Sequence, residues 1–270
     1  MEYLYEKENY LTPDKYVSGN IVEYDMEKAN INMLLRAGVI DQNYYNFLSY
    51  LPKREREIEV GKLHFIYTPE KGYPNNYIST VISEELKKYR KLLFESNNLK
   101  DEEIVRIAKD AIFVLRSYNL SQICFDGVVF RPKLVASAML NLNKILIFSK
   151  YNNLDQIEIE VKGLGNNDIY HQNGILVIIA NTMYIMERVS LKDALLYVQE
   201  TYKQYINKEL PIEYYREFNS FSCFKLVDSD LSPMFLDEKY KDIVDISYNI
   251  NFLRELYSIV FNLYMIHNRL

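Results

Sequence analysis

Two aspartates, Asp25 and Asp110, each lie where a short apolar strand pattern ends. Asp25 follows a candidate strand over residues 20–24, and Asp110 lies between the β-type runs Ile104–Ile107 and Ile112–Leu115. Mg²⁺ prefers hard carboxylate oxygens, and rigid neighbouring strands can hold two such groups close together. The pair therefore predicts a divalent-metal site that can act on phosphates.

Each aspartate also has an ordinary structural explanation. An Asp before a helix is most often an N-cap, and an Asp in a hairpin is most often a turn residue. Taken singly, each position favours that explanation. The pair is more informative, because both residues lie at strand ends with apolar flanks, and both interpretations remain open at this stage.

The segment after Asp25 has helical spacing of apolar residues from Asn30, and Gly38 suits the end of that helix. Asp41 is expected to cap a second helix that ends before Pro52. The segment around Asp110 predicts a tight hairpin with a carboxylate at its turn. These elements would position both aspartates.

The rest of the chain mixes strand and helix patterns without regular β-α alternation, so we predict an α+β fold with a helical C-terminal region. Residues 134–148 fit either a helix or a strand. The other expected elements are helices over 78–93, 190–206 and 251–267, a hairpin over 122–132 and a strand within 155–165.

The composition is that of a globular protein, with 49% hydrophobic and 26% charged residues. The formal net charge is −5, so contact with nucleic acid would need a local basic patch. No apolar run approaches membrane-spanning length, and the charged first ten residues do not resemble a signal peptide. Cys124 and Cys223 are expected to be reduced and buried, which indicates the cytoplasm.

Three stretches resemble motifs of template-dependent DNA polymerases. "IVEYDMEKANINMLLRAGVID" is similar to motif A of families A and B, in which a strand delivers a metal-binding Asp and a helix follows. "IVRIAKDAIFVLR" is similar to motif C, the hairpin with the second metal-binding Asp. "EVKGLG" resembles a Lys-Gly element of family B that contacts the primer-template. The chain as a whole resembles compact, palm-like proteins encoded by bacteriophages.

The resemblance implies roles for particular residues. Asp25 and Asp110 would bind Mg²⁺ or Mn²⁺, and Asn30 would occupy the position that excludes a ribose 2′-hydroxyl. Lys109 would contact substrate beside Asp110, and Lys162 with Gly163 would contact the primer-template. The implied reaction adds a nucleotide from a nucleoside triphosphate to a 3′-hydroxyl of a nucleic acid, in the host cytoplasm.

The resemblance also implies a domain organisation: an N-terminal arm over 1–19, a palm-like antiparallel sheet packed with helices over 20–188, and a helical region over 189–270. A short fingers-like insertion would span about 52–100. The fingers motif itself, a Lys followed by Tyr-Gly, is absent, and Asp110 is followed by Ala111 where the larger families have a second carboxylate.

Basic residues between the two motifs must then neutralise the triphosphate. We interpret Lys53, Arg54 and Arg56 as this phosphate-binding group. A second basic set shares one face of the helix over 78–93 and is interpreted as a solvated surface: Lys87, Lys88, Arg90 and Lys91.

Two other functions fit the same residues. One is a non-catalytic, palm-like protein that binds nucleic acid or a replication partner, which the missing fingers motif and missing second carboxylate favour. The other is a structural or interaction protein in which both aspartates are only a cap and a turn residue.

Overall fold

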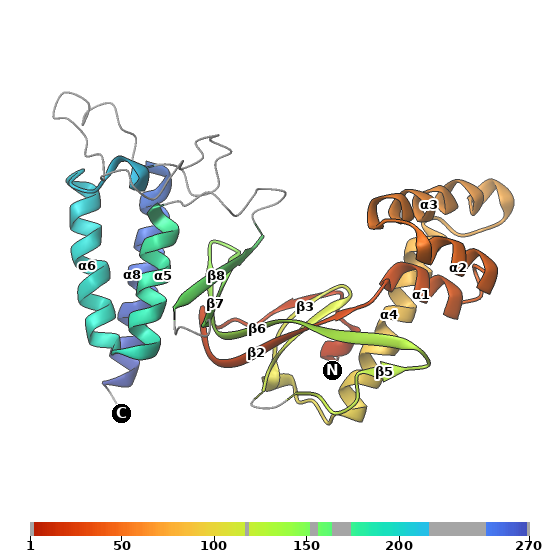
Figure 1. Cartoon of the computed structure of the whole chain (residues 1–270), viewed down its shortest axis with the longest axis horizontal. Helices are drawn as coiled ribbons and strands as arrows, with labels where there is room; N and C mark the ends of the chain where they lie inside the picture. Colours follow the sequence, from red (N-terminus) through yellow and green to blue (C-terminus); the bar gives the residue numbers. More distant parts are fainter. Residues whose placement is uncertain (1–2, 117–118, 152–155, 164–173, 216–246, 269–270) are drawn as a thin grey trace. The chain divides into compact units, whose positions relative to one another are not determined.

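The computed structural model describes residues 3–116, 119–151, 156–163, 174–215 and 247–268, and its antiparallel strands and helices confirm the predicted α+β class (Figure 1). The chain forms two compact units. The first comprises Met1–Pro13 and Asn20–Val135, and the second comprises Asp14–Gly19 and Ala136–Leu270. The predicted domain boundary at 188/189 falls inside the second unit and stays a prediction.

The sheet of the first unit has the strand order β1-β3-β4-β2-β6. Its strands are β1 (Asn9–Leu11), β2 (Tyr16–Met26), β3 (Ile104–Ala108), β4 (Ala111–Leu115) and the beginning of β6 (Val128–Leu142), which also pairs with the short β5 (Cys124–Phe125). The predicted hairpin of β3 and β4 is confirmed, with Lys109 and Asp110 at its turn. The hairpin of β5 and β6 is confirmed as well, around Asp126 and Gly127.

Four α-helices accompany this sheet: α1 (Ala29–Arg36), α2 (Gln42–Tyr50), α3 (Lys53–Ile66) and α4 (Tyr77–Ser96). Short 3₁₀ turns occupy Leu4–Glu6, Pro69–Lys71 and Asp101–Glu103. The predicted cap is confirmed, because the side chain of Asp41 accepts a hydrogen bond from the backbone N–H of Tyr44 at 2.8 Å. Helix α3 is additional to the predicted elements.

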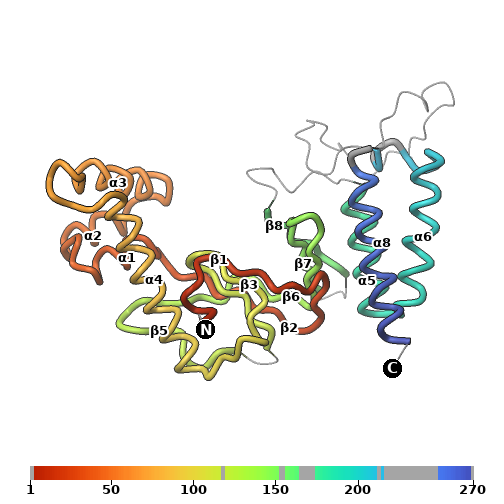
Figure 2. Tube along the Cα trace, turned by 180° about the vertical axis from the view of Figure 1, so that it is seen from behind, coloured from red at the N-terminus to blue at the C-terminus, as the bar shows by residue number. Residues whose placement is uncertain are grey.

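Helix α4 lies along one face of the sheet (Figure 2). Its Leu86 and Leu93 share a core with Val22 and Tyr24 of β2. Because side chains alternate along a strand, Glu23 and Asp25 must point to the opposite face. A second cluster, which includes Leu34, Leu48, Val60, Leu63 and Ile78, joins the four helices to one another.

The second unit contains the end of β6 with β7 (Ile145–Tyr151) and β8 (Ile157–Lys162), all antiparallel. The ambiguous residues 134–148 are therefore strand, with a turn between β6 and β7. Helices α5 (Gly174–Arg188), α6 (Leu191–Ile206) and α8 (Ser247–His267) run side by side (Figure 2), and a 3₁₀ turn covers Ile212–Tyr215. The expected helix start at Ser190 is confirmed, because its hydroxyl accepts from the N–H of Asp193.

Two details differ from the sequence-based expectations. Residues 1–19, expected to be an irregular arm, supply β1 and the start of β2, because β1 pairs with β3 from Asn9↔Ala108 to Leu11↔Arg106. Cys124 is exposed rather than buried, since β5 is a short edge strand; Cys223 lies outside the described residues. No helix in the described residues is long and apolar enough to cross a membrane.

Candidate active site

The end of strand β2 and the turn of the β3–β4 hairpin bring Asp25 and Asp110 together. Asp25 stands opposite Ala111 in the antiparallel register, and Asp110 directly precedes Ala111. The backbone N–H of Met26 donates to the carbonyl of Asp110 at 3.0 Å, which fixes the strand end against the turn. The strand end that carries Asp25 and the turn that carries Asp110 are therefore neighbours in the sheet.

The two carboxylates affect each other electrostatically. Burial is the main cause that raises the pKa of Asp110 above its usual range, and the nearby negative charge of Asp25 raises it further. Lys133 and Lys53 act in the opposite direction, because a positive charge favours the ionised carboxylate. A cation placed between the aspartates would relieve the repulsion between them.

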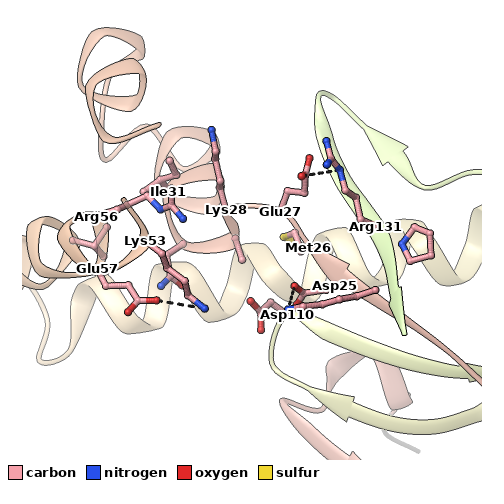
Figure 3. A pocket seen from close by; sticks show the side chains of 15 residues that line it. Asp25, Met26, Glu27, Lys28, Ile31, Lys53, Arg56, Glu57, Asp110 and Arg131 are labelled. Atoms are coloured by element: carbon pink, nitrogen blue, oxygen red, sulfur yellow. Dashed lines mark hydrogen bonds and ion pairs between the residues drawn. The ribbon is translucent and has the colours of Figure 1, made fainter. Parts of the chain in front are cut away.

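Both aspartates line a pocket of about 450 Å³ that opens between β2, the hairpin turn, α1, α3 and β6 (Figure 3). Figure 3 shows the side chains of Asp25 and Asp110 near each other in this pocket. Basic side chains supply much of its wall: Lys28, Lys53, Arg56, Arg131 and Lys133. This arrangement can hold a divalent cation on the carboxylates and an anionic ligand against the basic side chains.

Two of these basic residues, Arg131 and Lys133, belong to strand β6, and each forms an ion pair with an acidic residue. Lys133 Nζ lies 2.9 Å from Asp25 Oδ2, and this contact raises the pKa of the Lys133 amine. Arg131 Nε lies 2.7 Å from Glu27 Oε1. Sequence analysis missed both residues, although their spacing of two along a strand places them on one face, which was the available signal.

Helices α1 and α3 position the residues predicted to bind substrate. Asn30, in the first turn of α1, is exposed and lines the pocket. Lys53 and Arg56 line it from the first turn of α3, where Lys53 lies 3.9 Å from Glu57. Arg54 is exposed on the same helix but is not among the lining residues.

The remaining predicted site residues lie elsewhere. Lys109 occupies the hairpin turn in a left-handed conformation with φ of 52°, and its backbone N–H donates to the carbonyl of Glu8 at 2.8 Å. Lys162 ends β8 and lies 3.5 Å from Glu160. Gly163 follows with φ of 99°. Lys162 and Gly163 belong to the second unit and do not line this pocket.

One sequence-based interpretation is wrong. Arg90 was expected on a solvated face of α4, but its side chain is fully buried. Its Nε donates to the carbonyl of Tyr5 at 2.9 Å, and its Nη1 donates to the carbonyl of Lys109 at 2.6 Å. Arg90 therefore connects α4 with the turn that carries Asp110, a role that helical spacing alone could not indicate.

A comparison with known protein families assigns the chain to one of them. The family model described as "Bacteriophage PBS1 gene 130 protein" matches residues 1–262. The chain belongs to this phage family. No curated protein matches the chain. The match supports a phage origin, and its description names no activity.

The residues of this phage protein are suited to Mg²⁺ by the chemistry of their donors. Mg²⁺ is commonly held by one or two carboxylates together with substrate phosphates and water. Asp25 and Asp110 could supply two hard oxygen ligands beside basic groups that could receive phosphate. Within the described residues no group of three or more His, Cys, Asp or Glu side chains could hold a metal ion.

Proposed function

We propose that this protein is a metal-dependent nucleotidyltransferase that adds nucleotides to a 3′-hydroxyl. The observation that carries the proposal is that Asp25, at a strand end, and Asp110, at the adjacent hairpin turn, line one pocket together with five basic side chains. Nucleotidyl transfer needs both features, because charge develops on the transferred phosphoryl group while a hydroxyl must lose its proton. The resemblance to polymerase motifs A and C supports the same reaction class.

Each group of residues has a separate task in this proposal. Asp25 and Asp110 would hold Mg²⁺, which supplies Lewis-acid stabilisation of phosphate charge and makes a nearby hydroxyl more acidic. Lys53, Arg56 and Lys133 would bind the phosphates and orient them for in-line attack. Asn30, in the first turn of α1, would contact the sugar. Lys162 and Gly163 stay proposed primer-template contacts.

A second function is favoured by one specific observation. The amine of Lys133 forms an ion pair with Oδ2 of Asp25, so this carboxylate already has a partner without a metal. A non-catalytic protein that binds nucleic acid or a replication partner needs only the basic wall, with the aspartates serving to position it. This alternative predicts binding of nucleic acid without metal-dependent turnover.

Primer extension with Mg²⁺ or Mn²⁺ distinguishes the two functions. Asp25→Asn and Asp110→Asn keep the side-chain shape and remove the charge, so each should reduce extension by at least about 100-fold. Asp101→Asn, at an exposed acid outside both hairpins, should leave extension unchanged. Equal extension by all variants would contradict the proposal. Oligonucleotide binding without extension in any protein would establish the non-catalytic alternative.

A further inference from the structure

A second pocket, of about 460 Å³, adjoins the candidate active site within the first unit. Asn30, Glu57, Val60 and Asp110 line both pockets. The second pocket otherwise lies between α3, α4, the hairpin turn and the N-terminal segment. A ligand bound to the two aspartates can therefore extend from one pocket into the other.

The lining of the second pocket differs in kind from that of the first. Val60, Ile82 and Leu86 supply apolar surface, while Ser79 and Ser83 supply hydroxyl groups. The Ser83 hydroxyl donates to the carboxylate of Glu8, which also lines the pocket. The lining also holds ionisable groups: Glu8, Glu57, His64, Arg90, Lys109 and Asp110. Apolar surface beside hydroxyl groups suits a heterocycle and a sugar, and the carboxylates of Glu8 and Glu57 disfavour a polyphosphate.

Gly61 lines this pocket from α3 and places no side chain in it. It lies inside α3, where glycine is destabilising relative to alanine, and its backbone does not require positive φ. A Cβ added at Gly61 would meet nothing within 4 Å. Neither backbone conformation nor crowding in the protein therefore requires glycine here, whereas close approach of a ligand to the helix would.

Arg90 offers an independent indication of a ligand. This fully buried residue lines the second pocket, and its Nη2 has no hydrogen-bond partner within the described residues, although its Nε and Nη1 are both bonded. Buried donors normally have an acceptor, because an unsatisfied one is costly. A ligand oxygen or ring nitrogen could supply that acceptor.

We propose that the second pocket holds the base and sugar of a nucleotide whose phosphates lie in the first pocket. This inference rests on the proposed function and assigns the two parts of its substrate to two compartments. The shared residues Asn30 and Asp110 then lie where the sugar joins the phosphates. The basic wall receives the phosphates, and the face of α3 at Gly61 lies against the nucleoside.

Gly61 provides a test that spares the catalytic residues. Gly61→Leu should fill the second pocket, while Gly61→Ala adds one methyl group and should favour the helix. Binding is measured by calorimetry with Mg²⁺ for the eight common nucleoside and deoxynucleoside triphosphates and for inorganic tripolyphosphate. We expect the tightest nucleotide to bind wild type at least about tenfold more tightly than tripolyphosphate, because its base and sugar add contacts.

Gly61→Leu should remove this difference by weakening nucleotide binding about tenfold while leaving tripolyphosphate within about twofold of wild type. Because its methyl group is smaller, Gly61→Ala should weaken nucleotide binding less than Gly61→Leu does and leave tripolyphosphate binding as in wild type, and thermal unfolding confirms that both variants fold. If tripolyphosphate binds wild type as tightly as every nucleotide, or Gly61→Leu weakens both ligands equally, the inference is overturned and the proposed phosphate site stands. If wild type binds neither ligand, both fail together.

Discussion

Lys133 and the proposed metal ion would compete for the carboxylate of Asp25. The Lys133–Asp25 pair is only partly buried, with side chains 60% and 29% exposed, so its net contribution to stability is small. Such a weak pair can exchange readily for a divalent cation or turn towards a phosphate. The amine would thus protect Asp25 from repulsion by Asp110 when no substrate is bound.

This competition predicts that Lys133→Gln raises the affinity for Mn²⁺ in the absence of nucleotide. An exposed ion pair is worth up to about 1 kcal/mol, so the gain should be roughly two- to fivefold by equilibrium dialysis. Arg131→Gln is the matched control, because Arg131 lies on the same strand but pairs with Glu27. An equal gain in both variants would indicate a general charge effect and contradict direct competition.

The charge of Asp110 that the proposed function needs should lower the stability of the folded protein. Its pKa is raised in the folded protein, so just above its ordinary value of 3.8 the folded state binds more protons than the unfolded state. Folding stability must then fall as the pH rises through the raised pKa. At neutral pH the ionised Asp110 makes the folded state less stable than a neutral side chain would.

Asp110→Asn should therefore unfold at a higher temperature than wild type at neutral pH, although it loses the proposed activity. The advantage should shrink as the pH falls and the wild-type carboxyl takes up its proton. Thermal unfolding from about pH 4 to about pH 8 measures this difference. Asp101→Asn, at an exposed acid, should show no comparable gain. A variant less stable than wild type at neutral pH would contradict the electrostatic cost assigned to Asp110.

At the scale of elements, α4 does more than cover the sheet. Arg90 fixes the turn of β3 and β4 through the carbonyl of Lys109, and it fixes the N-terminal segment through the carbonyl of Tyr5. The position of Asp110 thus depends on a helix that supplies none of the predicted ligands. We infer that Arg90 is a positioning residue for the metal site.

Arg90→Lys keeps the positive charge but cannot reproduce the two directed hydrogen bonds of the guanidinium. We expect it to lower the free energy of unfolding by about 1–3 kcal/mol, the usual cost of leaving a buried acceptor unpaired. A merely structural role would leave Mn²⁺ affinity intact in the folded variant, whereas a positioning role should weaken it. Urea unfolding and Mn²⁺ dialysis separate the two, with Lys91→Gln on the exposed face of α4 as the control.

Local signals predicted the elements around the site, and long-range contacts account for what was missed. The cap at Asp41 and the hairpin turn at Asp110 depend on neighbours within a few residues, so the sequence indicates both. Arg90 contacts Tyr5, which is 85 residues away, and Lys133 contacts Asp25, which is 108 residues away. Spacing along one helix or strand carries no information about such partners.

For the whole molecule, charge is the property that most constrains a nucleic-acid partner. The net charge of −5 repels a polyanion at long range. The first pocket nevertheless collects five basic side chains against Asp25, Glu27, Glu57 and Asp110. Binding of nucleic acid would therefore depend on short-range contacts with few phosphates rather than on a broad positive surface.

Few phosphate contacts predict a moderate salt dependence for single-stranded oligonucleotides. With two or three contacts at about 0.7 counterions each, affinity should fall roughly tenfold between about 50 mM and about 200 mM salt, as measured by fluorescence anisotropy. Lys53→Gln with Arg56→Gln should weaken binding and flatten this dependence. The control pair Lys87→Gln with Lys91→Gln changes the net charge equally, but neither residue lines either pocket. If both pairs have the same effect, binding follows net charge and not the pocket; if salt has no effect, the phosphate contacts are absent.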